Sequence, residues 1–238
     1  MPAASVPPPS AEVLPAERER DPELPLRALA WIVIAFSLLQ VLLFAFGRDQ
    51  GIFAVIGRGV LDGKMPYRDL WDFKPPGIFL VYAAAFGVFG NSMIAPRLVE
   101  CLCLFAVVLG CRRLGGTLFG SRTAGLVGGA LAALVHAQLE FWHTAQPETF
   151  AGAFTVAALV LSTTETSRKR RLLASSLVGV CFGCCFLLKP TLAAPALVCA
   201  LYMAAHPPPP ATGWLCRVVP FVGVGIGALL PIALVGGW

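Results

Sequence analysis

The chemically richest part of the sequence is a polar segment between two apolar runs near the N-terminus. It carries Asp49, Asp69 and Asp72 and ends in Lys74, which two prolines follow. A carboxylate next to a low-dielectric wall can accept a hydroxyl proton as a bond forms, which accelerates a reaction by about 10²–10⁴. Asp49 closely follows the first apolar run, so it is predicted to be a general base. The alternative is a carboxylate that accepts hydrogen bonds from free backbone N–H groups at a helix N-terminus.

Three cations stand next to prolines at the ends of apolar runs. Lys74 and Lys189 each precede a proline, and Arg97 follows one. A proline fixes the backbone beside it, and a cation held at a membrane surface suits a phosphate group. The sequence therefore predicts that these side chains bind a phosphate. For Lys189 and Arg97 the alternative is that the side chain only extends to the aqueous surface, which avoids the cost of burying its charge.

A fourth carboxylate, Glu148, begins the apolar run after the polar connection 143–147. In the topology predicted from the apolar runs this connection shares a face with Asp49, so Glu148 is expected to support the site, together with Asp69 and Asp72. Its alternative role is a carboxylate favoured by the dipole at a helix N-terminus. Such oxygens also suit a divalent metal, which takes about six or more ligands. With three or four candidates, the sequence requires no cofactor and leaves metal binding open.

The composition assigns the chain to the membrane proteins. Of its 238 residues, 57% are hydrophobic and 13% are charged, whereas a soluble domain carries about 25% charged residues. The net charge of +5 is spread over the predicted loops, and no basic stripe alternates with exposed aromatics, so nucleic acid is excluded as a partner. Eight cysteines lie in or at the ends of apolar runs and are interpreted as small buried hydrophobic side chains.

The apolar runs predict an all-α polytopic membrane protein with about seven transmembrane helices. Residues 1–25 are rich in proline, alanine and glutamate and are predicted to form a disordered tail, followed by one transmembrane domain over 26–238. The run 26–46 is long enough to cross about 30 Å of hydrocarbon. A cleaved signal peptide is the alternative, which the long acidic tail disfavours. Further spans are predicted at 94–111, 123–140, 148–163, 172–188, 191–205 and 215–236.

Two segments between the first two spans are predicted to be juxtamembrane helices. The segment 52–61 has apolar residues at helical spacing on one face, and 77–90 is only about three and a half turns long. The basic clusters 112–122 and 168–171 are two spans apart and are expected to be cytoplasmic. If 77–90 crossed the membrane, the first loop would also be cytoplasmic, as its lysines and arginines suggest. The short length of 77–90 favours an extracytoplasmic loop.

The order of these motifs resembles the start of the polytopic GT-C glycosyltransferases. More narrowly, it is similar to the branch that contains dolichyl-phosphate-mannose–protein mannosyltransferases and the lipid A aminoarabinose transferase. The resemblance covers roughly residues 45–200. It is carried by the segments 49–51, 63–69, 72–77, 89–97, 146–150 and 187–190. Glu148 matches the second acidic motif of that family, and Lys189 matches its later lysine at a helix end.

The resemblance implies a polyprenyl-phosphate-linked sugar as donor and an extracytoplasmic first loop in a bacterial inner membrane. Asp49 would deprotonate the acceptor, while Lys74 and Lys189, with Arg97, would bind the donor phosphate. The resemblance leaves the sugar and the acceptor open. One departure is Gln50, where the family often has a second acidic residue. The family also has more spans and often an outer domain, so this chain is expected to be the N-terminal portion of a longer protein and inactive alone.

A non-enzymatic transporter or lipid-binding component is the alternative function. In that case Lys74 and Lys189 would only hold a lipid headgroup. A transporter is expected to bury charged pairs near the membrane midplane or to show internal repeats. Neither is visible in the sequence, where charges lie at the ends of apolar runs. This pattern favours a membrane-embedded glycosyltransferase.

Overall fold

The computed structural model describes residues 21–164, 167, 170–208 and 213–237. Most of the predicted disordered tail, residues 1–20, therefore lies outside the described residues. Within them the secondary structure is helical, with no strand, which confirms the all-α class. A 3-10 helix, η2, spans Pro190–Ala193. The α-helices are α1 (Leu24–Leu43), α2 (Arg48–Leu61), α3 (Gly77–Phe89), α4 (Ile94–Phe119), α5 (Arg122–Gln138), α6 (Glu140–His143), α7 (Pro147–Thr163), α8 (Arg171–Leu188), α9 (Pro195–Ala205) and α10 (Trp214–Gly236).

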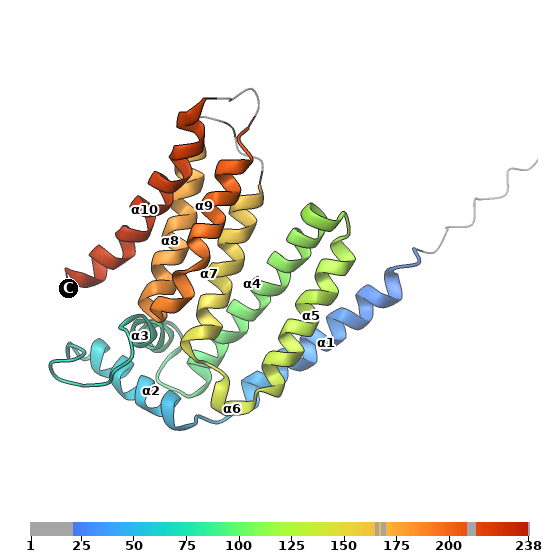
Figure 1. Ribbon diagram of the computed structural model, residues 1–238. Coiled ribbons are helices and arrows are strands. Elements are labelled where there is room, and N and C mark those ends of the chain that lie inside the picture. The colour runs from blue at the N-terminus through green and yellow to red at the C-terminus, as the bar shows by residue number, and fades with distance from the viewer. Residues whose placement is uncertain (1–20, 165–166, 168–169, 209–212, 238) are drawn as a thin grey trace, which may run out of the picture.

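The long helices run side by side in two groups. Helices α7 to α10 form one group, and α4 and α5 run together beside α7, with α1 packed on α5 (Figure 1). In the described part of the chain, four helices are long and apolar enough to cross a membrane: α1, α4, α8 and α10. Helices α5 and α7 have 17 residues each and α9 has 11. Length therefore identifies four of the predicted spans, and the three shorter helices run alongside them.

Glycines bring α8 and α10 into backbone contact. A Cβ atom added at Gly179 would collide with the backbone at Val224, and one added at Gly227 would collide with the carbonyl of Ser176. Gly179 and Gly183 are four residues apart and lie on one face of α8. Apolar side chains gain little by leaving lipid for a helix interface, so close approach at small residues is what holds such helices together.

The structure corrects the predicted end of the second span. A break was expected at Arg112, but α4 continues through both arginines to Phe119. Arginine is a good helix former and does not end a helix by itself. The helix ends instead at Gly120, whose left-handed conformation (φ 68°) lets the N–H of Ser121 donate to the carbonyl of Gly115 at 3.1 Å. Glycine adopts this conformation without steric cost.

Helices α2 and α3 lie across one end of the bundle, as predicted for juxtamembrane helices. Helix α3 is seen nearly end-on in Figure 1, whereas α7 to α10 run along the page. Its 13 residues reach about 20 Å, less than the hydrocarbon thickness of about 30 Å. Gly57 of α2 allows the close contact, because a Cβ there would lie 2.7 Å from that of Tyr82. Phe53 packs edge-on against Tyr82 at 5.7 Å between ring centroids.

Candidate active site

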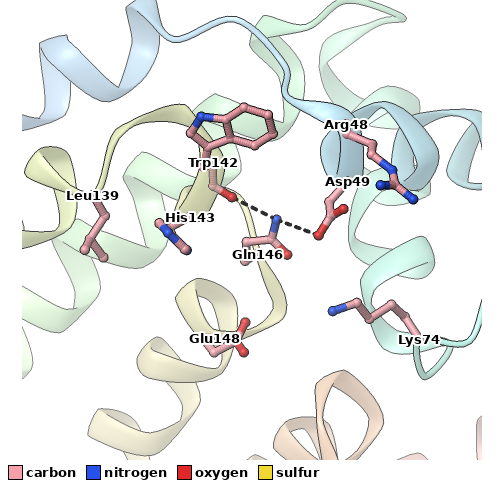
Figure 2. A pocket seen from close by; sticks show the side chains of 8 residues that line it. All are labelled: Arg48, Asp49, Lys74, Leu139, Trp142, His143, Gln146 and Glu148. Atoms are coloured by element: carbon pink, nitrogen blue, oxygen red, sulfur yellow. Dashed lines mark hydrogen bonds between the residues drawn. The ribbon is translucent and has the colours of Figure 1, made fainter.

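A cavity of about 760 Å³ lies at the end of the bundle where α2 meets the connection between α5 and α7. Its lining residues come from segments about a hundred positions apart in the sequence: Arg48, Asp49, Lys74, Leu139, Trp142, His143, Gln146 and Glu148. The side chains of Asp49, Lys74 and Glu148 point into the space between them (Figure 2). The structure therefore brings three of the predicted site residues to one cavity.

Asp49 lies in the first turn of α2 and is partly buried. The N-cap residue of this helix is Gly47, which has no side chain, so Asp49 is not the capping residue, although its place in the first turn also suits the helix dipole. Its Oδ2 atom accepts a long hydrogen bond of 3.5 Å from Nε2 of Gln146. The carboxylate thus faces the cavity with much of its accepting capacity free for another hydroxyl or N–H group.

The loop before α3 fixes the backbone of Lys74. The hydroxyl of Tyr67 donates to the carbonyl of Lys74 at 2.6 Å, and the ring of Tyr67 packs against Phe79. Tyr67 itself has a positive φ of 69°, an uncommon conformation for a bulky residue. Partial burial, and then the charge of Asp72, raises the pKa of Tyr67, so its phenol stays a hydrogen-bond donor at neutral pH. Lys74 is consequently presented to the cavity from a defined backbone position.

Lys189 reaches the site through Glu148. It caps the C-terminus of α8, and its Nζ donates to Oε1 of Glu148 at 2.5 Å. Both side chains are about half exposed, at 47% and 49%. Lys189 is therefore at the edge of the cavity, not among the residues that line it. Together with Arg48 and Lys74 it gives the site three cations against the two carboxylates Asp49 and Glu148, a net charge of +1.

Asp69 and Asp72 do not line the cavity, although both were expected to support the site. Asp69 pairs with Arg68 at 2.7 Å and accepts from the N–H of Met65 at 2.8 Å. These contacts lower the pKa of Asp69 to about 2. Asp72 is buried and accepts from the N–H of Phe73. Both carboxylates organise the loop that presents Lys74.

Among the described residues no three His, Cys, Asp or Glu side chains gather in a metal-binding arrangement. All eight cysteines are free.

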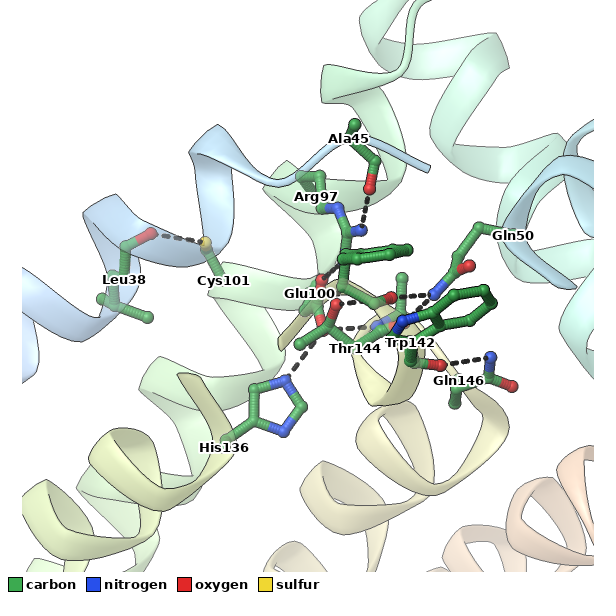
Figure 3. A network of polar contacts seen from close by, with 12 residues as sticks. Leu38, Ala45, Gln50, Arg97, Glu100, Cys101, His136, Trp142, Thr144 and Gln146 are labelled. Carbon is green, nitrogen blue, oxygen red and sulfur yellow. Dashed lines mark hydrogen bonds and ion pairs between the residues drawn. The ribbon is translucent and has the colours of Figure 1, made fainter. Parts of the chain in front are cut away.

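Arg97 is not at the cavity, which corrects its predicted contact with a phosphate. It is fully buried and donates to Glu100 at 2.8 Å, to Oγ1 of Thr144 at 2.7 Å and to the carbonyl of Ala45 at 2.9 Å (Figure 3). A proline-flanked arginine at the start of a span was expected at the aqueous surface. Its partner three residues later, at the i,i+3 spacing of a helical ion pair, is the sequence signal that was missed.

The surroundings of Gln50 account for an amide at this position, where the resemblance described above led us to expect a second acidic residue. Its side chain is fully buried, and Nε2 donates to the carbonyls of Phe141 and Thr144 at 2.5 and 2.7 Å. A carboxylate has no donor for two carbonyl oxygens unless it is protonated, so an acidic residue does not fit this position. The amide ties α2 to the connection that forms the opposite cavity wall.

Five lining residues were not predicted as site residues: Arg48, Leu139, Trp142, His143 and Gln146. Arg48 is exposed and has no hydrogen-bond or ion-pair partner in the part of the chain that the structure describes. Its position directly before Asp49 was the available signal. The other four lie in the connection between α5 and α7. The approach of this connection to α2 depends on contacts between residues nearly a hundred positions apart, which leave no local pattern in the sequence.

Comparison with known proteins adds one finding. A family model described as dolichyl-phosphate-mannose-protein mannosyltransferase matches residues 73–238, which include Lys74, Glu148 and Lys189. Neither the curated proteins nor the solved structures gave a match. Asp49 precedes the matched segment, so its assignment to the site depends on the cavity geometry. Because the model covers more than half of the sequence, the chain belongs to this family of GT-C-type membrane glycosyltransferases.

Proposed function

We propose that the protein transfers a sugar from a polyprenyl-phosphate-linked donor to an extracytoplasmic acceptor, which is a glycolipid, a polysaccharide or a protein. The observation that carries the proposal is the placement of Asp49 in one cavity with Arg48 and Lys74, beside the ion pair of Glu148 and Lys189. A proton acceptor next to an excess of positive charge suits a reaction in which a hydroxyl attacks and a phosphate leaves. Family membership supports the same class of reaction.

In the proposed reaction, the acceptor oxygen forms a bond to the anomeric carbon of the sugar. The bond from that carbon to the phosphate oxygen breaks, and the lipid phosphate leaves with the electron pair. Asp49 takes the proton of the acceptor hydroxyl. Attack from the side opposite the phosphate inverts the anomeric configuration. Lys74 and Lys189 stabilise the negative charge that develops on the leaving phosphate, and Glu148 holds Lys189 in place.

We further propose that the cavity faces away from the cytoplasm of a bacterial inner membrane. Helix α4 has 26 residues, about 39 Å, and runs from Ile94 near the cavity to Phe119 at the opposite end. A cysteine introduced at position 64 should react with a membrane-impermeant maleimide on intact cells, whereas one at position 118 should react only after permeabilisation. The reverse pattern would place the cavity in the cytoplasm and contradict the proposed mechanism.

The substitutions Lys74→Gln and Lys189→Gln should each weaken the binding of polyprenyl phosphate about 10- to 100-fold. Each removes a charged hydrogen-bond donor, worth about 1.5–3 kcal/mol to a bound phosphate. Affinity is measured with the full-length protein in lipid nanodiscs, and polyprenol serves as the ligand without a phosphate. Lys64→Gln is the matched control, since Lys64 is exposed on the same loop as Lys74 and does not line the cavity. Parental affinity in both variants would mean that the two lysines extend to the aqueous surface and do not bind the donor phosphate.

A further inference from the structure

We propose that Tyr82 and Glu100 are positioning residues that hold the backbone of Ala145 in a left-handed conformation. This Ala145 clamp sets the place of Gln146 and Glu148 in the cavity. The inference rests on the function proposed above, for which it names residues that touch neither donor nor acceptor. It is carried by the backbone of Ala145 and by the partners of that residue's two polar groups.

Ala145, in the connection that forms one wall of the cavity, has an uncommon backbone conformation. Its φ of 51° lies in the left-handed region, which residues with a Cβ atom rarely adopt. The residue is fully buried. It directly precedes Gln146, which lines the cavity together with Glu148 two residues later. Such a conformation persists only where the surroundings over-determine it.

Both polar groups of Ala145 bond to buried side chains. Its N–H donates to Oε1 of Glu100 at 2.5 Å, and its carbonyl accepts from the hydroxyl of Tyr82 at 3.1 Å. A buried peptide group needs such partners because no water replaces them. The two partners come from different helices, α4 and α3, and they hold the two peptide groups on either side of the Cα atom of Ala145, which fixes its backbone conformation.

The clamp is itself held in place. Glu100 is fully buried and also pairs with Arg97 and with Nε2 of His136, each at 2.8 Å (Figure 3). Tyr82 is fully buried, with Phe53 and Phe86 packed edge-on against its ring. Neither side chain has room to follow a peptide that moves. The clamp therefore acts as a rigid template for the chain at Ala145.

Loss of the clamp would change the cavity wall. An alanine released from it returns to a φ near −63°, a rotation of about 110° from the observed value. Gln146 follows directly, so its amide would turn away from Asp49, to which it now donates at 3.5 Å. Glu148 lies in the first turn of α7 and would move with Lys189, its ion-pair partner. Catalysis requires several groups in fixed relative positions, so a shift of about 1 Å in the cavity wall that carries Gln146 and Glu148 should lower the rate of the reaction.

The test compares Tyr82→Phe, Ala145→Gly and the double variant in the full-length protein. Tyr82→Phe removes only the hydroxyl and should lower kcat about fivefold, with KM for the lipid donor changed less than twofold. Glycine adopts the left-handed conformation without steric cost, so adding Ala145→Gly to Tyr82→Phe should recover at least half of the lost rate. Tyr202→Phe is the matched control, because Tyr202 lies at the other end of the bundle, stacked on His206. It should leave kcat unchanged.

A second measurement does not depend on catalysis. The ¹³Cα chemical shift of Ala145, assigned by its loss in Ala145→Gly, should report a left-handed residue in the parent protein and move toward the helical value in Tyr82→Phe. An unchanged shift, or a double variant as slow as Tyr82→Phe, would overturn the clamp. If the shift moves as expected but the parent transfers no sugar from any polyprenyl-phosphate donor, the clamp stands as a structural device and the proposed function fails.

Discussion

Asp49→Asn should lower the rate of sugar transfer by about 10²-fold or more while the protein remains folded. Asparagine keeps the size of the side chain and most of its hydrogen bonding but cannot take a proton from the acceptor. The structure indicates that folding does not depend on this carboxylate, because its hydrogen bond with the rest of the described chain is one long contact with Gln146. The rate is measured with full-length protein in liposomes, and the melting temperature is measured on the same sample.

Asp62→Asn is the matched control for this prediction. Asp62 lies at the other end of α2, is exposed, and forms only a loose ion pair with Arg58 at 3.6 Å. Such a pair contributes little to stability, and Asp62 does not line the cavity. Transfer at the parental rate in Asp49→Asn would remove Asp49 from the mechanism. An equal loss in Asp62→Asn would show that the rate responds to the charge of α2 in general.

Arg97→Met should destabilise the fold by about 3–5 kcal/mol. Removal of one partner from a buried ion pair leaves the other charge uncompensated, and Glu100 has no exposed surface through which water could replace the guanidinium. The variant also leaves Oγ1 of Thr144 and the carbonyl of Ala45 without their donor. Stability is measured by denaturation of the protein in mixed micelles. A variant as stable as the parent would mean that the pair contributes nothing.

Two further variants sharpen this result. Arg113→Met lies in the same helix, and Arg113 makes an exposed hydrogen bond of 3.4 Å to Thr164, so its substitution should change stability by no more than about 0.5 kcal/mol. The double variant Arg97→Met/Glu100→Met removes both buried charges and should regain part of the lost stability. The sugar-transfer rate of the double variant should stay below that of the parent, because the Ala145 clamp needs the carboxylate of Glu100.

The helices were predictable because their signals are local. The apolar spacing over 52–61 correctly predicted a helix with one apolar face, on which Phe53 and Ile56 are buried. The short length of 77–90 correctly identified a helix that lies across the bundle. The arginines at 112 and 113 misled the prediction for α4 because charge was taken to mark the end of a span. The helix actually ends at the left-handed Gly120, a signal that was also present in the sequence.

The site was predictable only in part. Asp49, Lys74 and Glu148 do line one cavity, and motif order placed them there. Arg97 was assigned to the phosphate because it was considered without Glu100, its buried partner. The contacts that bring the connection at 141–146 to α2 link residues more than ninety positions apart. No local pattern encodes them, so the contacts of Gln50, Tyr82 and Ala145 are known only from the structure, although the sequence had already marked Gln50 as a departure.

Release of polyprenyl phosphate from a polyprenyl-phosphate-linked sugar tests the central claim most directly. Purified full-length protein in liposomes is offered such donors carrying mannose, glucose, galactose or aminoarabinose, alongside the matching nucleotide-linked sugars, with membrane extract as the source of acceptor. We expect at least one lipid-linked donor to yield free polyprenyl phosphate and a sugar-bearing product, and the nucleotide-linked sugars to yield none. Transfer from a nucleotide sugar would contradict the proposed donor. Saturable binding of polyprenyl phosphate without transfer from any donor would contradict an enzymatic role and favour a lipid-binding component.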